Sequence, residues 1–499
     1  MNIKTREFFA KYIWVIPVVI GFALRLWDIT KSSIWHDEGY TMWLLRYNIP
    51  EIIARTARDV HPPGYYLIAK PWVGLFGNSV LSIRFLSLIF SVGIIYLTFK
   101  IVELIWDKRA AYWASLFVAF SPFLIKFAQE ARMYGVVAFF TTLATYYFIK
   151  FVKEKKAIYL LPYTLAMIVA MYTQYYSFFV IISLWLIFAI YTPDFWKFHW
   201  IRGFRTASGI FNWKWWLANI SLLIMYLPWF PVAYKQVTRV GGSYWIKPEW
   251  ITVRTIPANI LQFLTYDHLD SVYGWQGLLG ISVFWFIVFA LVGSGLLLFL
   301  DKKKRKLAAA LYVFGYLPMI LVFILSKLRT PIYQDRYFPF SAIAIFAIWG
   351  CVVAMIKSKK MRVAAASVLL LVMAFGILAM HKDVDHQMRQ VYEQVNNSRQ
   401  QSDVVLSGSL YTFLDGSYYF GYGKIRFIAN GVDGYGETSL FYDQAQDYMI
   451  APNDIGRLAD RVWVIDRPGE NNANNTPLLY WHQSQMIQEG TVTATLYTR

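Results

Sequence analysis

The sequence predicts an α-helical protein that crosses a membrane many times and carries a small α/β domain at its C-terminus. Three observations lead to this prediction. Hydrophobic residues make up 57% of the 499 residues and the mean hydropathy is +0.40, whereas soluble domains are about 45–50% apolar. The apolar residues gather in blocks of about 20, the length that spans a hydrocarbon core of ~30 Å. Basic residues cluster between these blocks.

Eleven of these apolar blocks are expected to form transmembrane helices. The first block is too long for a signal peptide and lacks a small-residue cleavage site, so it is expected to remain as a helix. The blocks run approximately through 12–29, 79–99, 110–125, 134–151, 157–172, 174–192, 215–234, 276–300, 307–326, 337–356 and 362–380.

The Lys and Arg clusters predict the orientation of these helices. Every second loop between apolar blocks is strongly basic, and basic loops remain in the cytoplasm. The N-terminus is therefore expected inside the cell and the C-terminus outside. The basic clusters lie within 4–11, 100–109, 150–156, 197–214, 302–306 and 357–362.

Charge and cysteine content exclude several classes of protein. The net charge of +18 is high enough to suggest nucleic acid, but its clustering between apolar blocks is explained by membrane orientation, so no nucleic-acid partner is expected. Cys351 is the one cysteine, which rules out a disulfide within the chain. This favours a multi-pass protein of a bacterial or archaeal inner (plasma) membrane.

The expected domains are a transmembrane domain, residues 1–380, and an extracytoplasmic α/β domain, residues 381–499. The transmembrane domain has two long outer loops, 30–78 and 235–275. Within the first loop, Tyr40–Tyr47 and Ile52–Arg58 mix apolar and basic residues at helical spacing. This pattern predicts amphipathic helices that lie in the membrane interface.

In the C-terminal tail, residues 381–499, strand patterns alternate with helix-compatible segments, which predicts a small α/β layer. Three short apolar runs predict buried strands, and the alternating stretch 491–497 predicts an edge strand. The intervening segments 409–420 and 443–459 are compatible with helices. The three buried strands are expected at Asp403–Ser407, Lys424–Ile428 and Arg461–Asp466.

The first chemical candidate follows the first apolar block. His36, Asp37 and Glu38 place an imidazole and two carboxylates next to the expected outer membrane surface. A carboxylate there can act as a general base, because partial burial raises its pKa toward the working pH. The same acidic pair can instead open an interfacial helix, where the helix dipole favours negative charge. The spacing leaves both interpretations open.

A second candidate is the segment from Asp59 to Tyr66. In it His61 precedes two prolines and Gly64, and Tyr65 and Tyr66 follow. His61 can contact a phosphate or an acceptor while the prolines fix the loop. Alternatively, the prolines only start a helix and the histidine has no chemical role.

Two further motifs pair an arginine with a tyrosine at the expected outer surface. One contains Glu130, Arg132 and Tyr134, and the other contains Arg336 and Tyr337. Arginine binds an anionic headgroup or phosphate through two parallel hydrogen bonds. Both motifs also suit a simple interface anchor, with tyrosine in the aromatic belt.

Metal ligands and buried charges complete the set of candidates. Asp267 and His268, together with His36 and Asp37, offer oxygen and nitrogen ligands for a divalent cation, although polar loop residues are more often not ligands. Arg25 and Arg84 lie near the outer ends of helices, where a charge must be paired or close to water. For Arg25 the neighbouring Asp28 is the expected partner, unless both arginines extend to the interface.

Taken together, these motifs resemble a known family. The chain is similar to the prokaryotic branch of the dolichyl-phosphate-mannose-protein mannosyltransferase-like glycosyltransferases of the GT-C superfamily, to which the lipid A aminoarabinose transferases are related. The resemblance covers roughly residues 10–380 and rests on the order of four motifs. They are Asp37-Glu38, the segment from His61 to Tyr66, Arg132-Met-Tyr134 and Arg336-Tyr337.

The resemblance implies a membrane glycosyltransferase that moves a hexose or pentose from a polyprenyl-phosphate donor to an acceptor on the outer face. The acceptor class, whether lipid, glycan or protein, stays open. By resemblance, Asp37 is the general base of an inverting displacement, with Glu38 beside it. His61, Arg132, Tyr134, Arg336 and Tyr337 are the expected ligands of the donor phosphate. His36, Tyr65, Tyr66, Arg84 and Glu130 are further site candidates.

The resemblance requires no cofactor and leaves a divalent cation open, with Asp37, Asp267 and His268 as its candidate ligands. The alternative function is a transporter or flippase of a lipid-linked glycan precursor. Transporters usually contain internal repeats and helices broken near the midplane, and the sequence has no convincing repeat. A third hypothesis is an assembly or sensor protein that uses its tail as a binding module.

Overall fold

The computed structural model describes residues 12–192, 213–240, 246–266, 285, 288–289, 292–382, 385–467 and 476–499. The chain forms two compact units, each built from two separate parts of the sequence. The first unit comprises Met1–Trp27 and Phe85–Lys382, and the second comprises Asp28–Arg84 and Asp383–Arg499.

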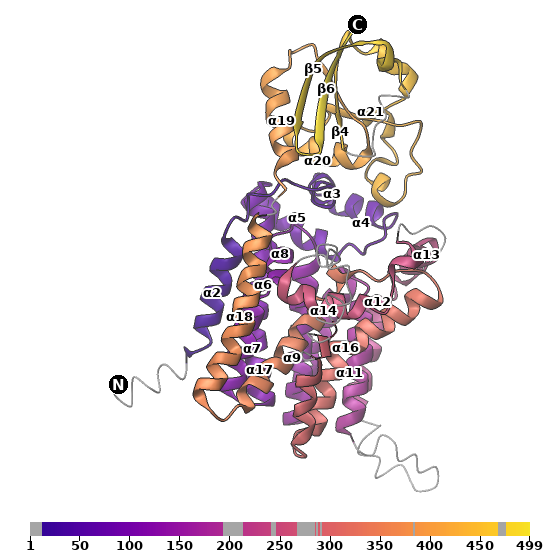
Figure 1. Ribbon diagram of the computed structural model, residues 1–499. Coiled ribbons are helices and arrows are strands. Elements are labelled where there is room, and N and C mark those ends of the chain that lie inside the picture. The colour runs from indigo at the N-terminus through magenta and orange to yellow at the C-terminus, as the bar shows by residue number, and fades with distance from the viewer. Residues whose placement is uncertain are drawn as a thin grey trace. The chain divides into compact units, whose positions relative to one another are not determined.

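The regular structure described in the first unit is all helical, and Figure 1 shows its longest helices running side by side. The described loops contain four short 3-10 helices: η1 (Ala157–Tyr159), η3 (Pro248–Trp250), η5 (Leu297–Leu300) and η6 (Asp335–Tyr337). Its α-helices are α2 (Val15–Leu26), α6 (Val80–Ile105, which begins in the second unit), α7 (Lys108–Phe120), α8 (Pro122–Ala128), α9 (Tyr134–Glu154), α10 (Leu160–Thr173), α11 (Ser177–Tyr191), α12 (Trp213–Tyr226), α13 (Phe230–Val240), α14 (Thr255–Thr265), α16 (Arg305–Leu328), α17 (Pro339–Met355) and α18 (Lys359–Lys382).

These helices confirm a polytopic membrane protein. Among the described residues, α6, α9, α16 and the helical stretch that starts with α18 are long and apolar enough to cross a membrane. Two bent pairs, α7–α8 at 59° and α12–α13 at 72°, raise that number to as many as six. Shorter apolar helices are α2, η1 with α10, α11 and α17. Each predicted span coincides with one of these, except 276–300, which lies mostly outside the described residues.

Close backbone approach holds α7 and α17 together in the first unit. A Cβ atom added to Gly350 would lie 2.7 Å from the Ala114 nitrogen and 2.8 Å from the Ala110 carbonyl oxygen. In a bilayer, helices gain little from hiding apolar surface from lipid, so tight packing of small residues stabilises their contact instead. The small side chains of Ala110 and Ala114 in α7, and the missing side chain of Gly350 in α17, therefore let the two backbones approach closely.

The second unit contains a six-stranded sheet in the order β3-β2-β1-β4-β6-β5. The neighbours from β3 to β4 pair in parallel, whereas β6 is antiparallel to both β4 and β5. The strands are β1 (Val404–Ser407), β2 (Ile425–Ile428), β3 (Met449–Ile450), β4 (Arg461–Asp466), β5 (His482–Glu489) and β6 (Val492–Thr498). The helices are α3 (His36–Leu44), α4 (Ile49–Thr56), α5 (Gly64–Phe76), α19 (Gln387–Ser398), α20 (Leu410–Phe420), α21 (Ala445–Tyr448), η7 (Gly436–Phe441), η8 (Pro452–Arg457) and η10 (Pro477–Tyr480).

The tail confirms part of the sequence prediction and corrects the rest. The three buried strands and the helix over 409–420 are confirmed as β1, β2, β4 and α20. The edge assignment of 491–497 is wrong, because β6 pairs on both sides and β5 forms the edge. The helix-compatible segment 443–459 contains two short helices, α21 and η8, with the unpredicted strand β3 between them. Strand β5 buries only Ile487, so its polar sequence gave no strand signal.

The first outer loop belongs to the second unit, and this changes the interpretation of Tyr40–Tyr47. Helix α3 is buried from Glu38 to Leu44 and packs against α20, where Gly39 faces the Leu414 carbonyl. Trp43 is fully buried among the rings of Phe413, Phe441 and Tyr448. The prediction of an interfacial helix is therefore wrong here: α3 is apolar because protein covers it.

The contact between α7 and α17 gives a stability prediction. We expect Gly350→Ala to lower the apparent melting temperature of the detergent-purified protein, because the new methyl group meets backbone atoms that cannot rotate away. Overpacking of this kind costs about 1–3 kcal/mol, more than the ~1 kcal/mol that alanine gains over glycine in a helix.

Gly74→Ala in α5 is the matched control, since no atom lies within 4 Å of the added Cβ. This control is expected to leave the melting temperature unchanged or to raise it. Equal effects of the two substitutions would contradict the tight packing at Gly350.

Candidate active site

The acidic pair of the first outer loop opens helix α3. Trp35 precedes the helix in extended conformation, and Asp37 and Glu38 occupy the first helical turn. This placement agrees with the helix dipole, which favours negative charge at a helix N-terminus. The two adjacent carboxylates then meet different surroundings, and this difference defines the site in the second unit.

Glu38 forms a buried ion pair with Arg84. The Arg84 Nε and Nη2 atoms donate to the two Glu38 carboxylate oxygens at 2.8 and 2.6 Å, and both side chains are only 1% exposed. Arg84 also donates to the carbonyl oxygens of Ile29, Ser32 and Ser33 at 2.8, 3.2 and 3.1 Å. The planar guanidinium thereby joins α3 to the loop before it through charge-assisted hydrogen bonds.

Asp37 is half-buried and lies in a more polar setting. One ligand atom from each of His36, Asp37 and Glu437 lies within 4.8 Å of the others. Nitrogen and carboxylate ligands at this spacing suit a divalent transition-metal ion. These three residues are therefore the group in the described chain that fits a cation, and they include two of the predicted ligands, His36 and Asp37.

The other two predicted metal ligands, Asp267 and His268, lie outside the described residues. Glu437 was not predicted. It begins η7 in the tail, and only the packing of the tail against the first outer loop brings it to Asp37. No local sequence pattern marks it as a ligand.

Aromatic side chains surround the start of α3. The His36 ring lies edge-on to Trp35 and Tyr411, with centroids 4.9 Å away in both pairs. Tyr419 accepts a hydrogen bond from the Ile34 amide at 2.9 Å, and burial raises the pKa of Tyr419 to about 12. Tyr419 therefore remains a neutral phenol at physiological pH and fixes the backbone that leads into the acidic pair.

The segment from Asp59 to Tyr66 is divided between a polar pair and a packed core. The Nδ1 atom of His61 lies 3.5 Å from the Asp59 carboxylate, which orients the imidazole. Helix α5 begins directly after Pro63, so the two prolines lie at the start of a helix. Tyr65 and Tyr66 are each 1% exposed and pack edge to face at 5.5 Å, which indicates a core role.

In the first unit, the two arginine-tyrosine motifs come together although they are far apart in sequence. The Arg336 guanidinium lies 5.9 Å from the Tyr134 ring centroid and 5.6 Å from that of Tyr337. The two tyrosine rings are themselves 6.0 Å apart. Tyr176, which was not predicted, stacks obliquely on Tyr337 at 4.7 Å. Arginine among tyrosines is an arrangement that can receive an anionic oxygen.

Arg132 lies next to this group in sequence, in the turn before α9. Its side chain is buried, with a residue exposure of 3%, and its amide donates to the Glu130 carbonyl at 2.8 Å. Lys126, in α8, adds a further cation that was not predicted, and its ammonium bonds the Tyr266 hydroxyl at 3.3 Å. The candidate phosphate ligands other than His61 thus belong to the first unit, whereas Asp37, Glu38 and His61 belong to the second.

Arg25 differs from the prediction. Its guanidinium donates to Ser91 Oγ at 2.8 Å and to the carbonyl oxygens of Ala119 and Val118 at 3.0 and 3.1 Å. Asp28, the expected partner, pairs with Lys31 at 3.3 Å instead. The predicted Arg25–Asp28 pair is therefore wrong.

Comparison with known proteins supports the resemblance drawn from the sequence. The family model described as dolichyl-phosphate-mannose-protein mannosyltransferase matches residues 60–229. A sequence comparison with curated proteins gives no significant match. Among solved structures, ArnT from Cupriavidus metallidurans bound to undecaprenyl phosphate is 13% identical, with a TM-score of 0.61 over 97% of this chain and 98% of that one.

Two further structures extend the comparison. The apo form of the same ArnT is 10% identical, with a TM-score of 0.62 over 97% of each chain. The oligosaccharyltransferase from Archaeoglobus fulgidus, in complex with zinc and sulfate, is 14% identical, with a TM-score of 0.53 over 91% of this chain and 68% of that one. The chain therefore has the fold of GT-C glycosyltransferases, as the sequence predicted.

The buried ion pair of the second unit gives a prediction. We expect Glu38→Gln to destabilise the protein by about 3 kcal/mol or more, the cost of leaving a buried charge without its counter-charge. The measurement is the thermal unfolding of the detergent-purified variant.

Glu51→Gln is the control, because Glu51 caps α4 at an exposed position and its loss costs ~1 kcal/mol or less. If both glutamines lowered the melting temperature by the same small amount, the structural role of the Glu38–Arg84 pair would be wrong.

Proposed function

We propose that the protein is a membrane glycosyltransferase that moves one sugar from a polyprenyl-phosphate donor to an acceptor outside the cytoplasm. The observation that carries this proposal is the contrast between Glu38 and Asp37 in a chain with the GT-C fold. Glu38 is committed to a buried ion pair, whereas Asp37, one residue earlier, is half-buried beside His36 and Glu437. A positioned, partly accessible carboxylate is what a general base requires.

In the proposed reaction, Asp37 removes the proton of an acceptor hydroxyl as that oxygen attacks the anomeric carbon of the donor sugar. The bond from this carbon to the phosphate oxygen breaks, and the polyprenyl phosphate leaves with the electron pair. The proton on Asp37 later passes to water. Because the attack opposes the leaving group, one displacement inverts the anomeric centre.

The leaving phosphate needs positive charge and hydrogen-bond donors. Arg336, held among Tyr134, Tyr176 and Tyr337, supplies both, and Arg132 is the second proposed ligand. His61, oriented by Asp59, is proposed as a further contact. Fixed donors of this kind stabilise charge that develops in the transition state. The ArnT structure bound to undecaprenyl phosphate supports a lipid-phosphate donor of this class.

The proposed scheme includes a site for a divalent cation. His36, Asp37 and Glu437 are the residues that would hold it, and its charge would stabilise an oxygen that loses its proton. The oligosaccharyltransferase of similar fold was solved with zinc, which supports testing the requirement.

We also propose the orientation and location of the chain. The alternation of basic loops supports an N-terminus in the cytoplasm and a C-terminal domain outside the cell, in the inner (plasma) membrane.

The first prediction from the proposed function concerns Asp37. We expect Asp37→Asn to reduce sugar transfer, or hydrolysis of the donor, by about 100-fold or more without lowering the melting temperature. Purified protein would be assayed with a panel of polyprenyl-phosphate monosaccharides, with and without chelator. Asp28→Asn is the control, because that carboxylate pairs with Lys31 near solvent.

Retained turnover in Asp37→Asn would rule out Asp37 as the base. If liposomes with wild-type protein moved labelled lipid across the bilayer without any sugar transfer, the flippase alternative would replace this proposal. Chelator sensitivity that Glu437→Gln reproduces would assign the cation to the three-residue group.

The second prediction concerns the donor phosphate. We expect Arg336→Gln to raise the KM for the donor about 10- to 100-fold, because a charged hydrogen bond to phosphate is lost. Arg329→Gln is the control, since Arg329 follows α16 in the same loop and is exposed. Competition by polyprenyl phosphate alone would measure the same loss. An unchanged KM and an unchanged competition constant would contradict a phosphate contact.

A further inference from the structure

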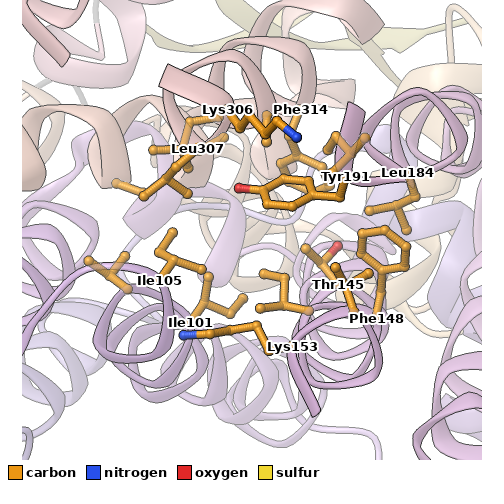
Figure 2. Close-up of a pocket in the computed structure, with 18 of the residues that line it drawn as sticks. Ile101, Ile105, Thr145, Phe148, Lys153, Leu184, Tyr191, Lys306, Leu307 and Phe314 are labelled. Carbon is orange, nitrogen blue, oxygen red and sulfur yellow. The ribbon is translucent and has the colours of Figure 1, made fainter. Parts of the chain in front are cut away.

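A cavity lies within the first unit, away from the arginine-tyrosine group. It has a volume of about 330 Å³ and lies between α6, α9, α11, α16 and α17. Figure 2 shows apolar side chains around it, among them Ile101, Phe148, Leu184 and Phe314. This volume is within the range of sites that bind small molecules.

Most of the polar atoms deep in the wall are already satisfied. The hydroxyls of Thr98, Thr142 and Thr145 donate to carbonyl oxygens one turn earlier in their own helices, at 2.8, 2.6 and 2.8 Å. They therefore offer methyl groups to the cavity, as threonines in such bonds do. The interior therefore suits a hydrocarbon chain, because these hydroxyls have no hydrogen left to donate to a polar ligand.

The same cavity has a basic rim. Lys153 is the last residue of α9 that lines the cavity. Three further lysines line it at or just before the start of α16: Lys303, Lys304 and Lys306. Lys153, Lys303 and Lys306 are exposed, and in Figure 2 Lys153 and Lys306 lie on opposite sides of the Tyr191 ring. None of the described residues that line the cavity is acidic.

Three carboxylates lie near the rim in sequence, and Asp301 accepts a hydrogen bond from the Lys303 backbone amide at 2.9 Å. The other two, Glu103 and Glu154, pair with lysines outside the rim. Glu103 pairs with Lys100 at 2.5 Å and with Lys108 at 3.8 Å. Glu154 pairs with Lys156 at 3.3 Å and with Lys150 at 3.8 Å. Lys153 donates a hydrogen bond to the Leu104 carbonyl oxygen, and the Lys304 ammonium lies 3.1 Å from the centroid of the Trp106 ring. The rim lysines form no ion pair with a carboxylate in the described part of the chain, so no carboxylate neutralises their positive charge.

The cavity is separate from the proposed donor-phosphate ligands. It is lined by α9 from Thr142 to Lys153, whereas Arg132 and Tyr134 stand at the opposite end of that helix. At 1.5 Å per residue, the axial distance from Tyr134 to Lys153 is about 28 Å. In α16 the lining residues belong to the first half, and Arg336 follows the other end.

We propose that this cavity binds an anionic glycerophospholipid, with one acyl chain in the cavity and the phosphate among Lys153, Lys303 and Lys306. The apolar interior suits an acyl chain, and the cationic rim favours an anionic headgroup over a neutral one. Anionic lipids are attracted to basic residues at the cytoplasmic surface, the side predicted for the loops that contain these lysines. The bound lipid bridges α9, α11 and α16 and stabilises the helical unit.

The test measures lipid binding to the delipidated, detergent-purified full chain by native mass spectrometry and by the rise in melting temperature. The probes are phosphatidylglycerol and phosphatidylcholine with identical acyl chains. We expect tighter binding of phosphatidylglycerol. The triple variant Lys153→Gln, Lys303→Gln, Lys306→Gln should lose about 100-fold in affinity for it, at about fivefold for each lysine.

Two further variants make the result specific. The matched control neutralises Lys357, Lys359 and Lys360, three basic residues on the same predicted side that do not line the cavity, and it should keep the preference for phosphatidylglycerol. Ala347→Leu places extra carbon atoms in the cavity wall and should weaken the binding of both lipids.

Equal losses in the two triple variants would overturn the site, because the effect would then come from general surface charge. Unchanged binding in Ala347→Leu would also overturn it. If polyprenyl phosphate bound more tightly than phosphatidylglycerol with the same dependence on the rim lysines, the phospholipid assignment would be wrong. None of these readouts depends on glycosyl transfer, so they stand apart from the proposed function.

Discussion

The buried ion pair between Glu38 and Arg84 is the interaction on which the organisation of the second unit depends. Two charges at 1% exposure are tolerated only when their hydrogen bonds are complete. Arg84 achieves this with the Glu38 carboxylate and the carbonyl oxygens of Ile29, Ser32 and Ser33. The loop that would otherwise connect two helices loosely is thereby fixed in one conformation, and α3 starts at a defined residue.

This ion pair also determines the direction and the solvent access of the Asp37 side chain. Glu38 must turn inward to neutralise Arg84, and in a helix the preceding residue then points about 100° away around the axis. Asp37 is consequently placed toward His36 and Glu437, with partial access to solvent. Two chemically similar carboxylates thus meet different surroundings, and the proposed role of Asp37 as a base depends on this difference, which recurs in acid-base sites.

The sequence predicted the parts of the fold that obey a repeating rule. Apolar blocks long enough for a bilayer matched helices wherever the structure describes them, since backbone groups in lipid must bond within a helix. The buried strands β1, β2 and β4 were equally clear. Strand β5 was not, because its residues are mostly polar and only its pairing with β6 orders it.

The candidate site shows the same division. The motifs that contain Arg132 and Arg336 were visible because an arginine beside a tyrosine at a helix end is a local pattern. Glu437 could not be predicted, since it comes close to Asp37 only when the tail folds against the first loop. The burial of α3 was not predicted for the same reason. Apolar residues such as Met42 and Trp43 give a helix the same sequence pattern whether lipid or protein covers it.

Arg25 shows how a buried charge can have a backbone partner that sequence reasoning overlooks. Helix α7 ends at Phe120 and α8 begins at Pro122, bent by 59°. Pro122 has no amide hydrogen, so the Val118 carbonyl loses the donor that a continuous helix would provide four residues later. Arg25 donates to that carbonyl and to Ala119, completing the hydrogen bonds of the broken helix. The charge expected near Asp28 therefore stabilises the bend, and its cost of burial is offset by carbonyl groups that would otherwise lack a donor in the membrane.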